Sequence, residues 1–212
     1  MRITLVHALK HSIAPIEASF AGLWPDARLM NLLDDSLSAD LARDGRLTDA
    51  MTGRFLALGR YAASAGADAI LFTCSAFGPC IDAVAHQHAP MPVLKPNEAM
   101  IEQAVARGRR IGLLSTFAPT LASMPPEFPG SVEIVPKLVT GALAALDRGA
   151  RAEHDRLVAE ASRELRDCDL IALAQYSMAP AAALVTDASG RPVLTTPDSA
   201  VLKLKQLLAV VG

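Results

Sequence analysis

The chain has 212 residues, of which 51% are hydrophobic, 20% are charged and 4% are aromatic, and its formal net charge is −2. This length and apolar content are typical of a globular protein with ample core in one or two domains. The balanced charge, without basic runs, excludes an evident nucleic-acid or anionic-membrane surface, and no apolar run reaches membrane-spanning length.

The first part of the chain alternates short apolar runs with segments of helical spacing. Strands are predicted at residues 3–6, 29–33, 70–72 and 93–94, and helices at residues 12–21, 49–65, after 79, and 97–107. Ser12 and Thr48 are expected to cap the first two helices. The polar residues 35–46 are predicted to form a loop long enough to cover a cleft.

The second part repeats this alternation. Strands are predicted at residues 111–114, 132–135, just before Gln175, and 193–194, and helices at residues 139–148, 150–166 and 198–210, the last capped by Asp198. The proline-rich residues 124–130 are expected to be a loop, and residues 187–191 a turn. Strands that alternate with helices at this spacing predict a parallel α/β architecture with right-handed crossovers.

An internal repeat relates the two parts. Residues 67–79 align with residues 168–180, and this alignment places Cys74 opposite Gln175. The identical pairs are Asp68 with Asp169, Ile70 with Ile171, and Pro79 with Pro180. Residues 2–5 and 92–94 find counterparts in 110–113 and 192–194, in the same order. The shared order predicts two related halves.

The predicted halves are not continuous in the sequence. The helix that begins at residue 97 leaves the first half, and the helix from 198 occupies the equivalent place after the second. We therefore expect one domain of residues 1–96 plus 198–212 and another of residues 97–197. Each sheet would present its strand ends to a shared cleft, where open parallel sheets bind their ligands.

Cys74 is predicted to lie on the turn between the carboxyl end of a buried strand and the start of a helix. The free backbone N–H groups and positive dipole of a helix start bind anions and lower the pKa of a thiol. The alternative is a buried Cys that acts only as a small hydrophobe. Cys80 and Cys168 are expected to be core residues, and three cysteines without a targeting segment indicate free thiols in the cytoplasm.

These motifs together resemble the aspartate/glutamate racemase superfamily, which includes hydantoin racemases, maleate isomerases and arylmalonate decarboxylase. The resemblance covers nearly the whole chain. It rests on residues 72–76, 111–116, 173–178 and 192–194, and on Pro197 with Asp198. It implies two pseudosymmetric, flavodoxin-like domains with the site between them, no cofactor and no metal. It also implies a small carboxylate as the substrate.

The racemases of this superfamily use two cysteines, one on each face of the substrate's α-carbon. Stereoinversion needs an acid/base on both faces, because one group reaches only one face. Cys74 matches the first cysteine, but Gln175 stands at the second position, and an amide has no proton to exchange near neutral pH. Two-base racemisation by thiols alone is therefore not expected here, although Gln175 can still hold a carboxylate or enediolate oxygen.

Cys74 is thus the predicted catalytic residue. Polar side chains at the other strand ends are predicted to bind the substrate: His7, Ser75, Ser115, Thr116, Gln175, Tyr176 and Ser177. Helix capping is the ordinary explanation for any one Ser or Thr among them. His7 is the one residue that we expect could replace the missing thiol, because its ordinary pKa suits proton transfer.

These residues predict a cofactor-independent isomerase or racemase-type enzyme that acts on a small carboxylic acid or amino acid and can form a homo-oligomer. Two alternatives stay open. One is a single-cysteine decarboxylase, which needs a proton on one face only. The other is a non-catalytic protein that binds small anions, in which Cys74 would be an ordinary, slowly alkylated thiol.

Overall fold

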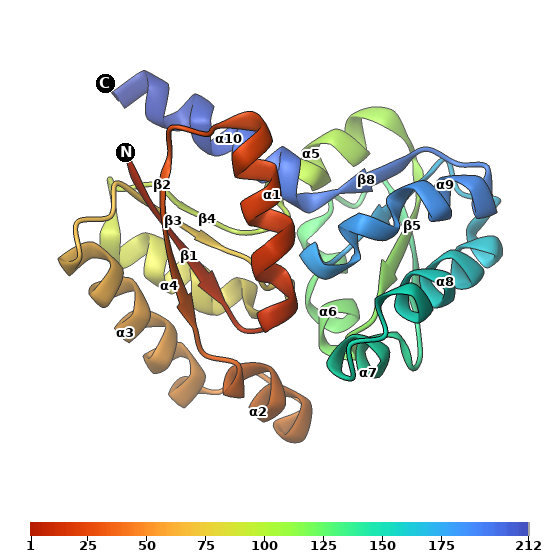
Figure 1. Ribbon diagram of the computed structural model, residues 1–212, viewed down its shortest axis with the longest axis horizontal. Coiled ribbons are helices and arrows are strands. Elements are labelled where there is room, and N and C mark those ends of the chain that lie inside the picture. The colour runs from red at the N-terminus through yellow and green to blue at the C-terminus, as the bar shows by residue number, and fades with distance from the viewer. Residues whose placement is uncertain (212) are drawn as a thin grey trace.

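A computed structural model describes residues 1–211 and shows two parallel four-stranded sheets (Figure 1). The strands of the first sheet are β1 (Arg2–His7), β2 (Arg28–Leu33), β3 (Ala69–Phe72) and β4 (Val93–Leu94). Those of the second are β5 (Arg110–Ser115), β6 (Glu133–Leu138), β7 (Leu170–Leu173) and β8 (Val193–Thr195). The sheet orders are β2-β1-β3-β4 and β6-β5-β7-β8, so each half has the same topology. The predicted fold of two related parallel α/β halves is confirmed.

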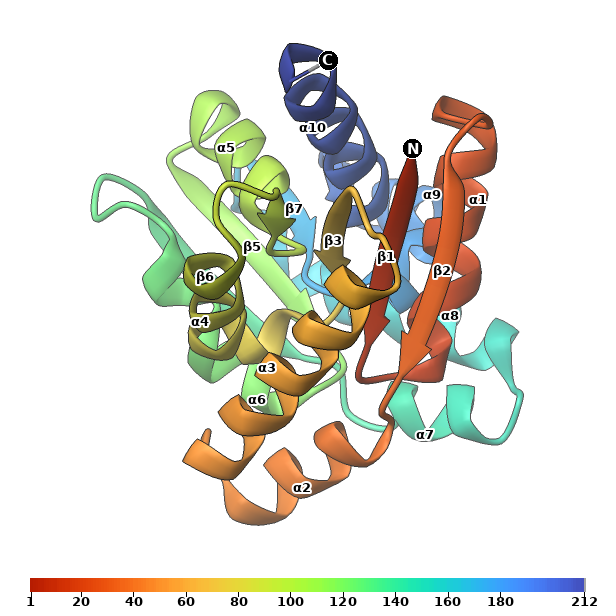
Figure 2. The same cartoon turned by 90° about the vertical axis from the view of Figure 1, so that its left-hand side faces the viewer.

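Helices connect successive strands and cover both faces of each sheet (Figures 1 and 2). Those of the first half are α1 (Ile13–Leu23), α2 (Ser36–Asp44), α3 (Asp49–Ser64) and α4 (Gly78–His88), followed by α5 (Glu98–Arg107). Those of the second are α6 (Ala118–Ser123), α7 (Ala142–Asp147), α8 (Arg151–Ser162), α9 (Ala182–Ser189) and α10 (Thr196–Val211). Short 3-10 turns precede or follow several of them: η1 (Lys10–Ser12), η2 (Ser75–Phe77), η3 (Pro125–Glu127), η4 (Arg163–Leu165) and η5 (Tyr176–Ala181).

The alternation of side chains along the strands builds a core on each face of the first sheet. Ile70 and Phe72 of β3 pack against Phe55 of α3 and the residues of α4. Ala69 and Leu71, which point the other way, pack with α1 and α10. Because a strand buried on both faces needs apolar side chains at every position, β3 reads as a continuous apolar run.

The C-terminal helix α10 crosses back to the first half. Ala200, Val201 and Leu204 of α10 lie in one buried cluster with Ile16 and Phe20 of α1. Figure 1 shows α10, in blue, beside α1, in red, at the opposite end of the sequence. The helix from residue 198 therefore contributes to the core of the first half, as its place in the repeat suggested.

Three segments differ from the sequence-based expectation. The first three of residues 187–191, predicted as a turn, belong to the helix α9, which was not predicted, and the chain turns at Gly190, where φ is 68°. Residues 35–46, predicted as a loop, contain the helix α2, whose Leu37 and Leu41 are buried against the first half. Leucines four positions apart lie on one helical face, and this period decides the structure despite the polar residues around them. The short helix α6 was not predicted. It lies between Phe117 and the proline-rich turn η3, and only Thr120 is buried within it.

The predicted helix starts are correct in part. Thr48 caps α3, and its Oγ1 accepts a hydrogen bond of 3.3 Å from the backbone N–H of Met51. Ser12 stands at the N-cap position of α1 but makes no capping hydrogen bond, and α10 begins at Thr196 rather than after Asp198. Within residues 1–211, no helix has the length and apolar character to cross a membrane.

Candidate active site

Cys74 and Gln175 occupy equivalent places in the two halves. Each is the second residue after the third strand of its half, β3 or β7, and each precedes a 3-10 turn. The backbones of both residues are extended, with φ/ψ of −119°/116° at Cys74 and −138°/142° at Gln175. The structure thus reproduces the alignment that the internal repeat gave.

The amide of Gln175 is fixed through its oxygen. Oε1 accepts hydrogen bonds from the Ser115 hydroxyl at 2.9 Å, the Thr116 backbone N–H at 2.6 Å and the Thr116 hydroxyl at 2.9 Å. The Nε2 group is buried and finds no hydrogen-bond partner within the described part of the chain. Because buried N–H groups almost always have an acceptor, Nε2 is an unsatisfied buried donor.

Cys74 is 7% exposed, and burial raises the pKa of its thiol to about 11. The neighbouring backbone of Ala76 and side chain of Ser38 oppose this rise without cancelling it. The Ser38 hydroxyl itself donates a hydrogen bond of 2.7 Å to the Ala8 carbonyl. The expectation of a lowered pKa was wrong for this conformation. The turn η2 separates Cys74 from the first residue of α4, Gly78, so the thiol does not sit at the helix N-terminus.

His7 is held inside the first half. Its Nδ1 lies 2.7 Å from the Thr73 hydroxyl and its Nε2 lies 2.9 Å from Asn31 Oδ1. Asn31 in turn donates to Glu17 Oε1 at 2.8 Å. Burial lowers the pKa of His7, which keeps the ring neutral. With both ring nitrogens engaged, His7 has no free nitrogen to exchange a proton with a substrate in this conformation.

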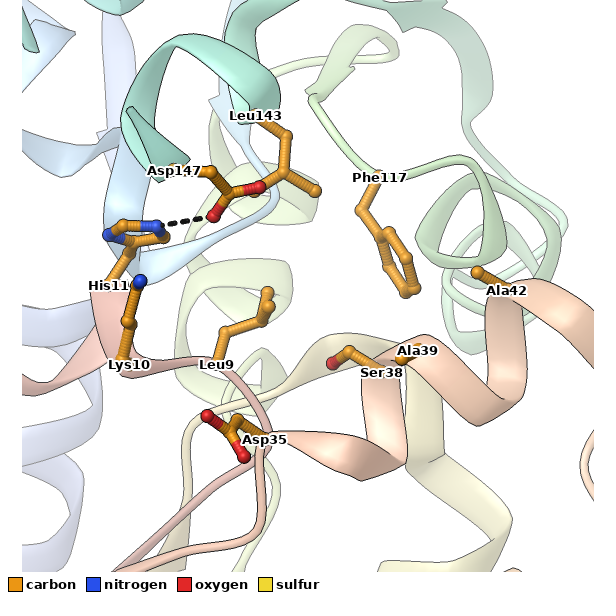
Figure 3. Close-up of a pocket in the computed structure, with 10 residues that line it drawn as sticks. All are labelled: Leu9, Lys10, His11, Asp35, Ser38, Ala39, Ala42, Phe117, Leu143 and Asp147. Carbon is orange, nitrogen blue, oxygen red and sulfur yellow. Dashed lines mark hydrogen bonds and ion pairs between the residues drawn. The ribbon is translucent and has the colours of Figure 1, made fainter. Parts of the chain in front are cut away.

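A cavity of about 330 Å³ lies where the two halves meet at the carboxyl ends of β1, β2, β5 and β6 (Figure 3). Its walls come from both halves, and the lining residues are Leu9, Lys10, His11, Asp35, Ser38, Ala39, Ala42, Phe117, Leu143 and Asp147. Cys74 does not line the cavity, but it lies in one buried cluster with Phe117, which does.

A match to a protein-family model identifies the family of this chain. Residues 14–124, just over half of the chain, match the model of the Asp/Glu/Hydantoin racemase family. The chain belongs to the Asp/Glu/hydantoin racemase family. The resemblance drawn from the strand-end motifs is thereby confirmed. No curated protein matches this sequence.

Solved structures agree in fold at low sequence identity. Glutamate racemase from Francisella tularensis is 13% identical with a TM-score of 0.76, and the match covers 98% of this chain and 80% of that one. Allantoin racemase from Klebsiella pneumoniae is 17% identical with a TM-score of 0.67, over 99% and 88% of the two chains. A double mutant of arylmalonate decarboxylase is 18% identical with a TM-score of 0.67, over 97% and 92%.

The remaining predicted site residues lie where the two halves of this racemase-family protein meet. Ser75 donates a hydrogen bond of 3.2 Å to Thr120 of α6, and its carbonyl accepts one of 3.3 Å from Ser123. Tyr176 is inserted into the core that α1 and α10 form, and neither its hydroxyl nor that of Ser177 has a partner in residues 1–211. Of the predicted set, none lines the cavity itself, although Ser115, Thr116 and Gln175 meet next to Phe117.

None of the ten lining residues was predicted from the sequence as a site residue, and His11 and Asp147 are the pair among them that forms a contact between the halves. His11 Nε2 and Asp147 Oδ1 are 2.8 Å apart, and they join the turn η1 of the first half to the end of α7 in the second. His11 could have been chosen from the sequence, because it lies shortly after the carboxyl end of β1 and parallel sheets bind their ligands at these strand ends. Asp147 offered no such signal, since only the tertiary structure brings α7 beside η1.

A second contact between the halves involves a half-buried carboxylate. Glu127 of η3 reaches the start of α4, where a Cβ added to Gly78 would lie 3.2 Å from Glu127 Oε1. Burial raises the pKa of Glu127 to about 7, and the negative charges of Asp82 and Glu98 add to this rise while Lys95 opposes it. The folded protein therefore holds this proton more tightly than the unfolded chain does.

We expect Glu127→Gln to stabilise the protein at neutral and alkaline pH but not near pH ~4.5. An acid whose pKa is raised on folding costs stability as the pH rises from its unfolded value, near 4.5, to its folded value, near 7. Allowing for its partial exposure, the gain at pH ~8 is about 1–2 kcal/mol, with none near pH ~4.5. Urea denaturation at both pH values measures it, with Glu160→Gln on the exposed face of α8 as the matched control. Equal gains at both pH values would contradict the assignment.

Proposed function

We propose that this protein is a cofactor-independent isomerase or racemase-type enzyme that acts on a small carboxylic acid or amino acid. Cys74 serves as its acid/base or nucleophile. The equivalence of Cys74 and Gln175, each two residues beyond the third strand of its half, is the observation that carries the proposal. We also propose that residues 1–96 plus 198–212 form one domain and residues 97–197 the other.

Gln175 supplies the binding counterpart to the thiol. Three hydrogen bonds to Oε1 fix the orientation of the amide, so its unpartnered Nε2 is preorganised as a donor. A carboxylate oxygen of the substrate, or the same oxygen in an enediolate, is a suitable acceptor. A donor that is fixed before the reaction stabilises developing negative charge without the cost of reorganisation.

The state of Cys74 supports a role in which the thiol gives a proton. A thiol with a pKa of about 11 is protonated near neutral pH, so it is ready to protonate a carbanion or enediolate. Acting in the opposite direction, as a base, requires that a substrate or a positive charge in the cavity stabilise the thiolate.

Proton NMR in deuterated water tests this function. The panel consists of both enantiomers of small amino acids, dicarboxylates, hydantoins and substituted malonates, each incubated with the purified protein. We expect at least one member to lose its α-hydrogen signal, to isomerise or to lose carbon dioxide. A panel in which nothing reacts, although a member binds and shifts protein resonances, would support the non-catalytic anion-binding alternative instead.

Single-cysteine decarboxylation is the second candidate, and a specific observation favours it. Cys74 follows the carboxyl end of β3, while Gln175, at the equivalent place after β7, carries no exchangeable acid proton near neutral pH. Loss of carbon dioxide from a malonate leaves an enediolate that needs one proton on one face. In the same panel, a monocarboxylate product of single configuration would identify this reaction.

A further inference from the structure

We propose that His11 is the second acid/base of this site and that Asp147 positions it. The inference rests on the function proposed above and supplies the proton carrier that Gln175 cannot be. His11 lines the cavity, and its side chain is 13% exposed, so the ring is accessible without being freely mobile. The residue occupies the first half, but its hydrogen-bond partner belongs to the second, so the pair forms only when the halves are together.

The hydrogen bond to Asp147 leaves the other ring nitrogen available. Nε2 lies 2.8 Å from Asp147 Oδ1, and within residues 1–211 no hydrogen bond engages Nδ1. A carboxylate on one nitrogen fixes the ring orientation and stabilises the imidazolium that forms when the other nitrogen takes a proton. This is the arrangement that a general base requires.

His11 and Cys74 approach the cavity from different walls. Figure 3 places His11 and Asp147 along one wall, and Ser38, Ala39 and Ala42 along another. Cys74 lies in one buried cluster with Phe117, and Figure 3 shows Phe117 on the side of the cavity away from His11. A small substrate held between His11 and Phe117 would therefore have the imidazole on one side and the Cys74 thiol toward the other. Stereoinversion needs this placement, because each acid/base reaches a single face of the α-carbon.

The proposed step removes one proton from the substrate and delivers one to it. Nδ1 of His11 takes the α-proton, and the electron pair of the broken C–H bond moves into the carboxylate to form an enediolate. The S–H proton of Cys74 then bonds to the opposite face of the α-carbon. The step ends with an imidazolium and a thiolate, and one proton passing from the former to the latter through solvent restores the starting state. Burial of Cys74 favours the neutral thiol from which this direction begins.

The other histidines are poorly placed for this role. His7 has both ring nitrogens engaged within the first half. His154 is fully buried in α8 against Asp155, and neither it nor His7 lines the cavity. His86 and His88 lie on α4, outside the cavity. Lys10, next to His11, adds a positive charge to a cavity wall that also carries the carboxylates of Asp35 and Asp147.

Affinity labelling tests the placement without a known substrate. Bromoacetate is a small carboxylate with an electrophilic α-carbon, and Cys74→Ser protein is used so that the thiol does not compete for it. We expect carboxymethylation of His11 about tenfold faster than that of the exposed His86, with protection by malonate and a slower rate in Asp147→Asn. Labelling of His11 no faster than of His86, or unaffected by malonate, would overturn the proposal. Peptide mass spectrometry measures both residues in one sample.

Isotope exchange tests the role once a panel member reacts. His11→Gln should lose α-proton exchange from one enantiomer by about 100-fold or more and keep exchange from the other, while Cys74→Ser should show the mirror-image pattern. His86→Gln is the control and should behave as wild type.

If His11→Gln inverts the substrate at the wild-type rate while Cys74→Ser is inactive, the inference fails and the proposed function stands. If Cys74→Ser retains full turnover, the proposed function itself fails.

Discussion

Replacing Cys74 by serine is expected to abolish turnover of any substrate that the panel identifies. A hydroxyl is a much weaker acid than a thiol, so it neither delivers nor takes a proton at a comparable rate, and the loss should be about 1,000-fold or more. The side chain keeps its shape and its neighbours Ser38 and Ala76, so the free energy of unfolding should fall by only about 1 kcal/mol. Steady-state rates and urea denaturation of the same preparation separate the two effects.

Cys80→Ser is the matched control for this experiment. Cys80 is fully buried, its sulfur lies 3.4 Å from the Thr52 hydroxyl of α3, and it does not line the cavity. Its replacement tests the effect of removing a buried thiol without touching the proposed site, so activity should persist. Wild-type activity in Cys74→Ser, or inactivity in both variants, would refute the assignment of Cys74.

The two α/β halves could be predicted from the sequence, because the patterns that specify their strands lie within short segments. A continuous apolar run such as residues 69–72 predicts a buried parallel strand, and the recurrence of Asp, Ile and Pro at equal spacing after residue 168 indicates a second copy. The same reasoning failed at residues 36–44. There the polar residues outweighed the spacing of Leu37 and Leu41, which pack against the first half only because α2 docks there.

The site was less predictable, because its chemistry depends on what the folded chain surrounds. Sequence reasoning placed Cys74 at a strand end but assigned it a lowered pKa, since it could not foresee that burial would outweigh the helix start. It selected His7 over His11, although the two differ by only four positions. The direction of the His7 ring toward Asn31, and that of His11 toward Asp147, follow from residues distant in sequence.

Replacing Tyr176 is expected to produce the largest change in stability, because this residue of the second half is packed into the core of the first. It is 1% exposed and belongs to one cluster with Ile16, Phe20 and Val201. Tyr176→Ala removes an aromatic ring from a close-packed core and should lower the free energy of unfolding by about 3–5 kcal/mol. Since the ring joins the two halves, we also expect the variant to unfold less cooperatively.

Tyr176→Phe should have the opposite effect. The hydroxyl has no hydrogen-bond partner in the described part of the chain, and an unpaired buried polar group costs about 1–3 kcal/mol, so its removal should raise the free energy of unfolding by about 1 kcal/mol. Tyr61→Phe, on the exposed face of α3, is the control and should change nothing measurable. If Tyr176→Phe instead lowers both stability and turnover, the hydroxyl has a partner in the working enzyme. That result would support the substrate-binding role predicted from the sequence and would contradict the expected gain in stability.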